Sequence, residues 1–350
     1  MKQFLFGMAA ALAIGVAPAA AQTPLFSDNS EIQLVVEAPL TTLIRQAARN
    51  PQPHAGAVTL MGSGDPVRFD MELSARGVSR RTLGICSFPP LRIDLQQGGR
   101  RGTLMQGQDK IKVVTLCRSG PRYEQMHALE GLAYRMYNTI TDYSYRVRPA
   151  RITYRDSEGR RREETQLNWL VEDIDDVARR NGRRVALDVV SGQLRYAQLN
   201  GRAATELALF QLMIGNLDWD MQQSSAGRDC CHNVRHLATS ETATDNIIPV
   251  PYDFDSSGLV DAPYAVPPEG LGVRNVRQRH YRGMCRFNDQ VPAVIATFQE
   301  RRAAINALIT AETRLGETRR GSTQRYIDEF FELIADPARV QSQIIERCRG

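Results

Sequence analysis

The fold is decided by a stretch that reads IGNLDWD (residues 214–220), DCCHN (229–233) and IIPVPYDFDSSG (247–258). The last block opens with a short apolar run that is typical of a buried strand. Carboxylates follow that run directly, and a carboxylate at the end of a buried strand is costly unless a positive partner meets it. A divalent metal ion is one such partner.

The polar side chains of this stretch are two aspartate pairs and one asparagine between them: Asp218, Asp220, Asp253, Asp255 and Asn233. Two separate sources of carboxylate and one amide suit divalent-metal phosphate chemistry when they converge on one cleft. The pattern therefore predicts a metal-assisted phosphate site. An aspartate near a helix end or a turn also serves structural roles, so the residues alone leave that reading open.

The composition is that of an ordinary globular protein, with 350 residues of which 42% are hydrophobic and 24% charged. The length suits two modest domains or lobes. The formal net charge is +5, and only three lysines contribute to it, so arginine supplies nearly all the positive charge. Because the arginines are dispersed along the chain, the sequence predicts no nucleic-acid partner.

The first residues resemble a secretory signal peptide. Lys2 is followed by an apolar segment, Phe4–Val16, and by the small residues Ala19–Ala21. We expect residues 1–21 to be removed before Gln22. Since no later segment reaches the roughly 20 apolar residues of a membrane helix, we expect no integral membrane segment after cleavage. The predicted location is the periplasm or the medium outside the cell.

Six cysteines fit an oxidising compartment, where disulfides form by default: Cys86, Cys117, Cys230, Cys231, Cys285 and Cys348. We expect Cys86 to pair with Cys117, and the other four to pair among themselves. A bond between the adjacent Cys230 and Cys231 is not expected, because a vicinal disulfide strains the backbone. Zinc is a rival explanation, but the chain contains no Cys-x-x-Cys motif.

Apolar alternation predicts strands in the first half, and helical spacing predicts helices further on. The predicted strands are Ala57–Met61, Val67–Leu73, Leu91–Leu95, Lys110–Leu116, Tyr145–Tyr154 and Gln166–Val171. The predicted helices are Tyr123–Ile140, Ala203–Ile214, Val291–Arg314 and Thr323–Arg347. We therefore expect an α+β chain with a β-rich N-terminal lobe (residues 22–172) and an α-rich C-terminal lobe (173–350).

Several blocks, in this order, resemble the CotH family of atypical, spore-coat-type protein kinases. They are RGVSRR with FPPLRIDL, KIKVVTLC, LEGLAYRMYN, TQLNWLVEDID, and then GNLDWD, HN and IPVPYDFDSSG. The likeness covers most of the chain from about Val67. It implies a two-lobe protein-kinase-like fold, with Mg²⁺ or Mn²⁺ and ATP or another phosphate donor in the cleft.

By position, the resemblance implies that Asp218 acts as the base for a hydroxyl acceptor, with Asp220 next in line. Asn233, Asp253 and Asp255 match the metal-binding positions. The remaining candidates are cofactor-binding residues: Lys110, Lys112 and Glu172. Lys110 and Lys112 are two apart on one predicted strand and so share a face, which makes either the candidate for the phosphates.

The implied reaction is phosphoryl transfer to a hydroxyl of a protein or small molecule. About fifteen residues separate Asp218 from Asn233, more than ordinary protein kinases have, and no glycine-rich phosphate loop stands out. A bacterial periplasm is also not expected to hold ATP. Two alternatives therefore remain: a non-catalytic envelope scaffold that keeps the fold, and a metal-dependent hydrolase that needs no nucleotide.

Overall fold

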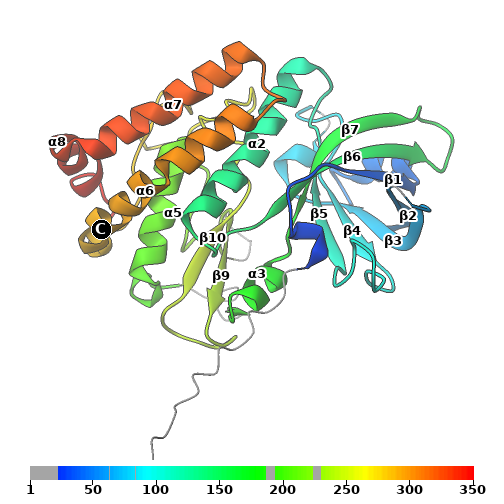
Figure 1. Cartoon of the computed structure of the whole chain (residues 1–350), viewed down its shortest axis with the longest axis horizontal. Helices are drawn as coiled ribbons and strands as arrows, with labels where there is room; N and C mark the ends of the chain where they lie inside the picture. The colour runs from blue at the N-terminus through cyan, green and yellow to red at the C-terminus, as the bar shows by residue number, and fades with distance from the viewer. Residues whose placement is uncertain (1–22, 63, 83, 187–193, 224–229) are drawn as a thin grey trace, which may run out of the picture.

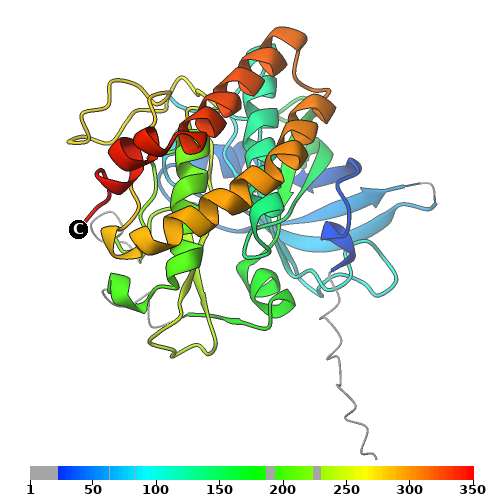
Figure 2. The same cartoon turned by 60° about the vertical axis from the view of Figure 1, so that its left-hand side comes forward.

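The computed structural model describes residues 23–62, 64–82, 84–186, 194–223 and 230–350. The predicted signal peptide lies outside these residues. Figures 1 and 2 show a barrel of strands beside a group of long helices, with a smaller sheet below the helices.

Seven strands form a closed barrel in the order β1-β2-β3-β4-β5-β7-β6. Their bounds are β1 Ile32–Ala38, β2 His54–Met61, β3 Val67–Ala75, β4 Leu91–Leu95, β5 Lys110–Val114, β6 Val147–Asp156 and β7 Glu164–Val171. Neighbouring strands pair antiparallel, except that β1 and β6 pair parallel and close the barrel. Side chains alternate between buried and exposed along β3, so its apolar residues fill the interior.

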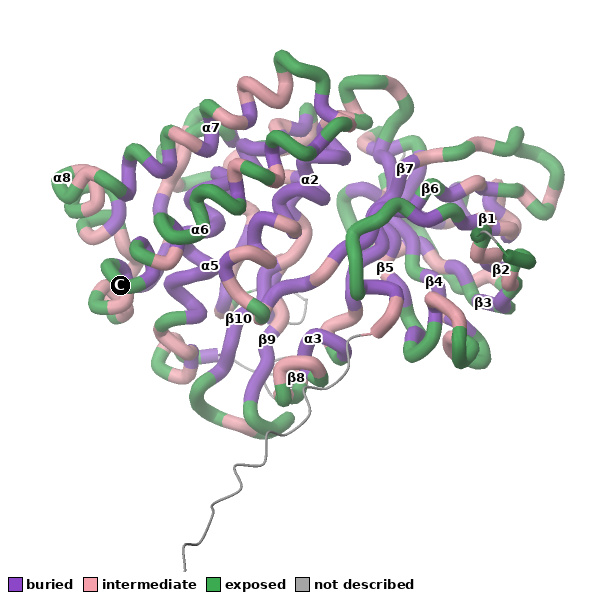
Figure 3. The backbone as a smooth tube through the Cα atoms, in the orientation of Figure 1, coloured by how far each residue is buried: buried purple, intermediate pink, exposed green. Residues whose placement is uncertain are grey.

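The helices gather around a second core. Their bounds are α1 Leu40–Gln46, α2 Pro121–Ile140, α3 Ile174–Arg180, α5 Gly201–Ile214, α6 Val291–Ala311, α7 Glu317–Ala335 and α8 Pro337–Val340. Short 3₁₀ turns cover Pro24–Phe26, Ser79–Arg81, Tyr196–Gln198 and Cys285–Gln290, and a π-helical turn covers Gln341–Ile345. The tube in Figure 3 shows α5 buried along most of its length, as its apolar sequence requires.

A three-stranded antiparallel sheet in the order β10-β9-β8 completes the fold. Its strands are β8 Arg184–Val185, β9 Val234–Ala238 and β10 Ile248–Pro251. All four residues of β10 are buried, as the apolar run predicts. Helix α5 packs against β10, so the hairpin of β9 and β10 lies firmly on the helical core.

The expected two-lobe kinase-like fold with a separate N-terminal sheet lobe is wrong, because the strands close into a seven-stranded barrel of mixed pairing. The physical reason lies in β1, whose two edges are both used. It pairs with β2 on one side and with β6 on the other, so the sheet has no free edge. Helix α2 also joins the helical core, where it packs with α5 and α6.

The element predictions agree with the structure to within a few residues, with one clear difference at the C-terminus. The helix predicted over Thr323–Arg347 is broken, because α7 ends at Ala335. Asp336 then accepts hydrogen bonds from the backbone N–H groups of Ala338 and Arg339 and caps the short α8. Pro337 cannot continue the hydrogen bonding of α7, which explains the break.

Three disulfides are present: Cys86–Cys117, Cys285–Cys348 and Cys230–Cys231. The first confirms the prediction, and all are compatible with an exported protein. The expectation that Cys230 and Cys231 would not bond to each other is wrong. Because Cys285 is joined to Cys348, the adjacent pair has no other cysteine to bond. Within the described residues, no helix has both the length and the apolar character needed to cross a membrane.

Close packing of α2 on the barrel depends on Gly131. A Cβ atom there would overlap the indole ring of Trp169, which is fully buried. We predict that Gly131→Ala lowers the free energy of unfolding by about 1–3 kcal/mol, the usual cost of overpacking a core. Urea unfolding measures this, with Gly62→Ala as control, since a Cβ at Gly62 meets no atom within 4 Å. Equal stability of the two variants would contradict the packing described here.

Candidate functional site

The hairpin of β9 and β10 places Asn233 and Asp253 side by side. Val234 pairs with Pro251, and the backbone N–H of Tyr252 donates to the carbonyl of Asn233 at 3.0 Å. Asn233 and Asp253 both have left-handed backbone, with φ of 53° and 65°. Asparagine and aspartate tolerate this conformation better than most residues, and it is common where a functional side chain must be re-aimed.

Asp218 joins this pair from the turn after α5. Its carboxylate lies 2.5 Å from Nε2 of His232, and its side chain is 39% exposed. The amide of Asn233 donates both to the carbonyl of Asp218 at 2.7 Å and to its Oδ2 at 3.2 Å. The structure therefore brings Asp218 and Asn233 together as the sequence predicts.

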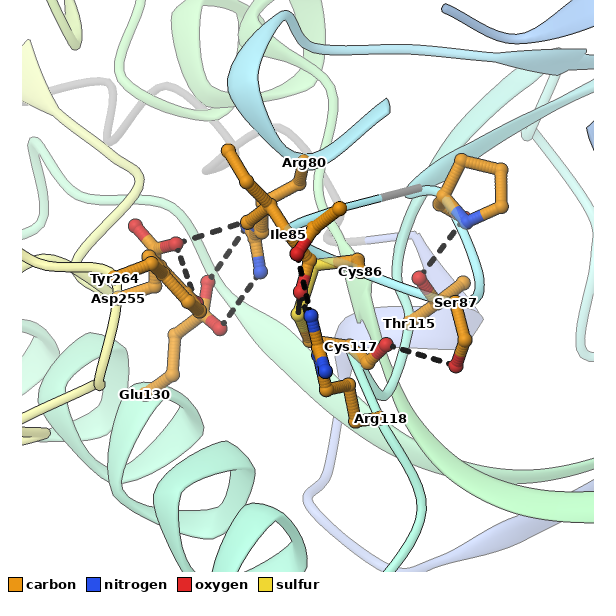
Figure 4. The surroundings of a disulfide bond; sticks show 12 residues. Arg80, Ile85, Cys86, Ser87, Thr115, Cys117, Arg118, Glu130, Asp255 and Tyr264 are labelled. Carbon is orange, nitrogen blue, oxygen red and sulfur yellow. Dashed lines mark hydrogen bonds and ion pairs between the residues drawn. A yellow bond between two sulfur atoms is a disulfide. The ribbon is translucent and has the colours of Figure 1, made fainter. Parts of the chain in front are cut away.

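The positive partner of the second acidic cluster is Arg80. Its guanidinium lies 2.9 Å from Asp253, 3.2 Å from Asp255 and 3.3 Å from Glu130 on α2. Figure 4 shows Arg80 facing both Asp255 and Glu130, with the Cys86–Cys117 disulfide on its other side. The side chain of Arg80 is only 7% exposed, so these contacts are made away from water.

Three carboxylates around one guanidinium leave an excess of negative charge. Burial raises the pKa of Glu130, an effect that Arg80 opposes and that Asp255 and Asp253 reinforce. Burial also raises the pKa of Asp255, where both Asp253 and Asp218 add to the shift. These mutual effects show that the acids of both clusters lie within electrostatic range of each other.

Two tyrosines complete this acidic group. The hydroxyl of Tyr264 donates to Asp255 at 2.8 Å, and the hydroxyl of Tyr134 accepts from the backbone N–H of Asp253 at 2.9 Å. Both carboxylate oxygens of Asp255 therefore have partners. Oδ2 contacts Tyr264 and Arg80, and Oδ1 has a weaker contact with the hydroxyl of Ser256 at 3.4 Å. In contrast, Oδ2 of Asp253 and Oδ1 of Asn233 accept no hydrogen bond from the described residues.

Cations gather on the opposite wall. Lys112 and Arg76 line a cavity of about 10 Å³, room for about one water molecule, with Asp253 and with the rings of Tyr145 and Tyr252. Burial, together with the positive charges of Arg76 and Arg235, lowers the pKa of Lys112 to about 8, against the opposing effect of Asp173. This concentration of positive charge beside Asp253 suits an anionic ligand.

Three predicted site residues lie elsewhere. Asp220 caps a turn through the N–H groups of Gln222 and Gln223 and pairs with Arg349 at 3.1 Å. That role is structural, because it ties the C-terminal residues to the chain after α5.

Glu172 and Lys110 also stay outside the cavity. Glu172 pairs with Arg180 at 3.0 Å, whereas the partner of Lys112 is the next residue, Asp173, at 3.7 Å. Lys110 is exposed and makes no ion pair within the described residues. Of the two lysines on one face of β5, Lys112 lines the cavity with Asp253 and Lys110 does not.

Sequence reasoning missed Arg80, Arg76 and Glu130. The two arginines belong to the basic turn RGVSRR, which carries the family likeness but was given no role in the site. Glu130 lies on the apolar side of a predicted helix, and a lone acid on a buried face is itself a signal that a positive partner exists. The buried position of Glu130 could therefore have predicted an arginine partner, although it could not have identified that partner as Arg80.

The metal prediction is not decided by these contacts. Within the described ranges, no group of three or more His, Cys, Asp and Glu side chains has the arrangement of a metal site. An asparagine oxygen can also bind Mg²⁺, which is commonly held by one or two protein oxygens together with phosphate oxygens and water. The unpartnered oxygens of Asp253 and Asn233 fit that second arrangement.

The Arg80 group predicts a pH-dependent stability. The pKa of Glu130 is raised to about 8 from 4.5, so the folded protein binds this proton more tightly than the unfolded chain. The resulting stabilisation is complete below pH 4.5 and is lost as the pH rises towards 8. We predict that wild type loses stability relative to Glu130→Gln across this window.

Unfolding by urea at a series of pH values measures that difference. The exposed Glu124, in the first turn of the same helix, provides the control substitution Glu124→Gln. If wild type and Glu130→Gln had parallel pH profiles, a raised pKa at Glu130 would be contradicted.

Comparison of the chain with protein-family models found no match. A search of curated proteins also found none. The CotH likeness therefore stays a prediction, and the function is argued below from the site alone.

Proposed function

We propose that Lys112 and Arg76 hold the phosphate groups of a donor and that the site passes a phosphoryl group to a hydroxyl acceptor. The cavity that these residues line with Asp253 measures only about 10 Å³, so its walls must separate to admit the donor. One observation carries the proposal: Lys112, Arg76 and Asp253 line the same cavity, and Asp253 lies beside the Asp218–Asn233 pair. Positive side chains to hold phosphate and oxygen ligands to hold a metal thus face each other. Both are needed for phosphoryl transfer.

Lys112 and Arg76 neutralise and orient the phosphates of the donor. The Lys112 ammonium is held by Asp173 and lies 5.3 Å from the centre of the Tyr145 ring, which fixes its direction. Because the pKa of Lys112 is lowered to about 8, an incoming phosphate also raises it again and strengthens its own binding. The donor is ATP or another phosphate compound of the compartment in which the protein works.

Asp218 accepts the proton of the acceptor hydroxyl. Its side chain is 39% exposed, so an acceptor can approach it, while His232 and Asn233 fix its orientation. The hydroxyl oxygen forms a bond to phosphorus, the bond from phosphorus to the leaving oxygen of the donor breaks, and the proton moves to the Asp218 carboxylate. Donor and acceptor supply all the other atoms.

Asn233 and Asp253 are the residues that would hold Mg²⁺ or Mn²⁺, through Oδ1 of Asn233 and Oδ2 of Asp253. Such an ion would neutralise charge on the phosphate oxygens. We assign Asp255 a positioning role in place of the metal-binding role that its position in the sequence implied. Its oxygens hold Arg80 and Tyr264, so it positions Arg80 against Asp253.

One observation favours a second candidate function, a non-catalytic scaffold. Arg80 already balances part of the charge of Asp253 and Asp255, so the fold does not need a metal to accommodate them. A scaffold reading predicts that Asp253→Ala leaves the biological role intact. Phosphoryl transfer predicts its loss.

We predict that Lys112→Met abolishes phosphoryl transfer while Lys110→Met retains it. The two lysines lie on the same face of β5, but only Lys112 lines the cavity with Asp253. The assay incubates the purified mature protein with labelled ATP or polyphosphate, Mg²⁺ or Mn²⁺, and an envelope extract, and follows label in the product. Thermal unfolding checks that both variants fold. Equal activity of the two variants would remove Lys112 from the site.

We predict that Asp218→Asn lowers kcat by about 10²–10⁴-fold, the usual contribution of a general base. KM for the donor should change little, because Asp218 contacts the acceptor and not the phosphate-binding cations. Calorimetry with donor and metal supplies the binding check. Absence of both nucleotide and divalent-metal binding by the wild-type protein would refute the enzyme proposal as a whole.

A further inference from the structure

A cavity of about 590 Å³ lies outside the site above. It is lined by the turn between β4 and β5, by α3, by β8 and by Glu241. Figure 3 shows α3 and β8 next to each other below the barrel. The cavity meets the proposed site at one point, because Asp173 in its wall is the ion-pair partner of Lys112.

The wall of this cavity is acidic, although the protein as a whole is basic. Five carboxylates line it, against three guanidinium groups: Asp109, Asp173, Asp175, Asp176 and Glu241, with Arg179, Arg183 and Arg184. Asp173 and Asp176 are already paired, with Lys112 and Arg179 respectively. No ion pair is recorded for the other three acids among the residues the structure describes.

These acids repel one another. Partial burial raises the pKa of Asp175, and the charges of Asp173 and Asp109 raise it further. Lys110 and Arg179 act in the opposite direction without cancelling the shift. A positive charge placed in the cavity would relieve this repulsion.

An unpaired acceptor lies in the same wall. Gln108 is 2% exposed and donates from Nε2 to Asp176 at 3.2 Å. Its Oε1 is buried and has no hydrogen-bond partner in the part of the chain that the structure describes. Buried amide oxygens are nearly always satisfied, so an unpaired one in a cavity wall indicates a ligand that carries N–H or O–H donors.

A metal ion is a poor match for this wall. Its acids are not gathered as a metal-ligand group within the described residues. A ligand with several N–H donors along an extended chain can instead contact acids at separate places. Three acids of the cavity wall are exposed and therefore accessible to such a ligand: Asp109, Asp175 and Glu241.

We propose that this cavity binds an organic polycation, a chain that carries several ammonium groups. The source of that chemistry is either a free polyamine or the lysine side chains of a peptide. The site would act on binding only, with no covalent step, and it does not depend on phosphoryl transfer at Lys112. Its position next to Asp173 would allow a bound cation to compete with Lys112 for that carboxylate.

Calorimetry with spermidine and with trilysine tests the proposal on the mature protein at low salt. We expect at least one of the two to bind at a single site, and the one that binds identifies the source. A variant that combines Asp109→Asn, Asp175→Asn and Glu241→Gln should bind it about tenfold more weakly, since three charge pairs are lost.

The matched control removes three exposed carboxylates elsewhere, with Asp70→Asn, Glu300→Gln and Glu332→Gln. It changes the net charge equally and should bind as the wild type does. Three results would overturn the proposal: no binding of either probe, equal weakening in both variants, or full displacement of the probe by an equal concentration of Mg²⁺. All six substitutions are on exposed side chains, so loss of folding is not expected to obscure the outcome.

Discussion

The structure depends on the ion pairs of Arg80. This residue lies in the turn between β3 and β4, whereas Glu130 belongs to α2 and Asp255 follows β10. A buried guanidinium without carboxylates, or buried carboxylates without a guanidinium, would each be strongly destabilising. The Cys86–Cys117 disulfide anchors the same turn to the end of β5 (Figure 4). The barrel and the helical core are therefore joined by charge as well as by apolar packing.

This constraint also determines what the site can offer a ligand. Arg80 donates to Oδ1 of Asp253, and Arg80 and Tyr264 both contact Oδ2 of Asp255. Among the described residues, Oδ2 of Asp253 is therefore the carboxylate oxygen beside Asn233 that can still bind a ligand. On the other side, Lys112 is paired with Asp173, and Lys112 and Arg76 share their cavity with Asp253. The arrangement thus places two positive side chains next to a limited set of oxygen ligands, as the proposed phosphate site requires.

Local features could be predicted from the sequence, and distant partners could not. The alternation of apolar and polar residues predicts the strand β3, and the helical spacing of apolar residues predicts the helix α5, because each pattern lies within one segment of the chain. Barrel closure depends on β1 pairing parallel with β6, more than a hundred residues away, and nothing in seven residues encodes that partner. The same limit applies to Arg80, which is 173 positions from Asp253. The ion-pair partner of Lys112 is likewise not encoded locally: it is Asp173, whereas the adjacent Glu172 pairs with Arg180, since adjacent side chains point in different directions.

The acidic cluster contains more charge than stability requires. Because its pKa is raised to about 8, Glu130 is largely protonated at neutral pH, so Asp255 alone can balance the single charge of Arg80. Asp253 nevertheless adds a further carboxylate on a left-handed backbone. Asn233 has the same unfavourable backbone and also keeps a free oxygen. A neutral residue in place of Asp253 would lose the 2.9 Å contact with Arg80, but it would remove the surplus charge and the left-handed aspartate. A site that binds a metal cation needs such surplus negative charge, here on Asp253, next to an unpaired amide oxygen, here on Asn233. This observation favours the proposed catalytic site over a non-catalytic scaffold.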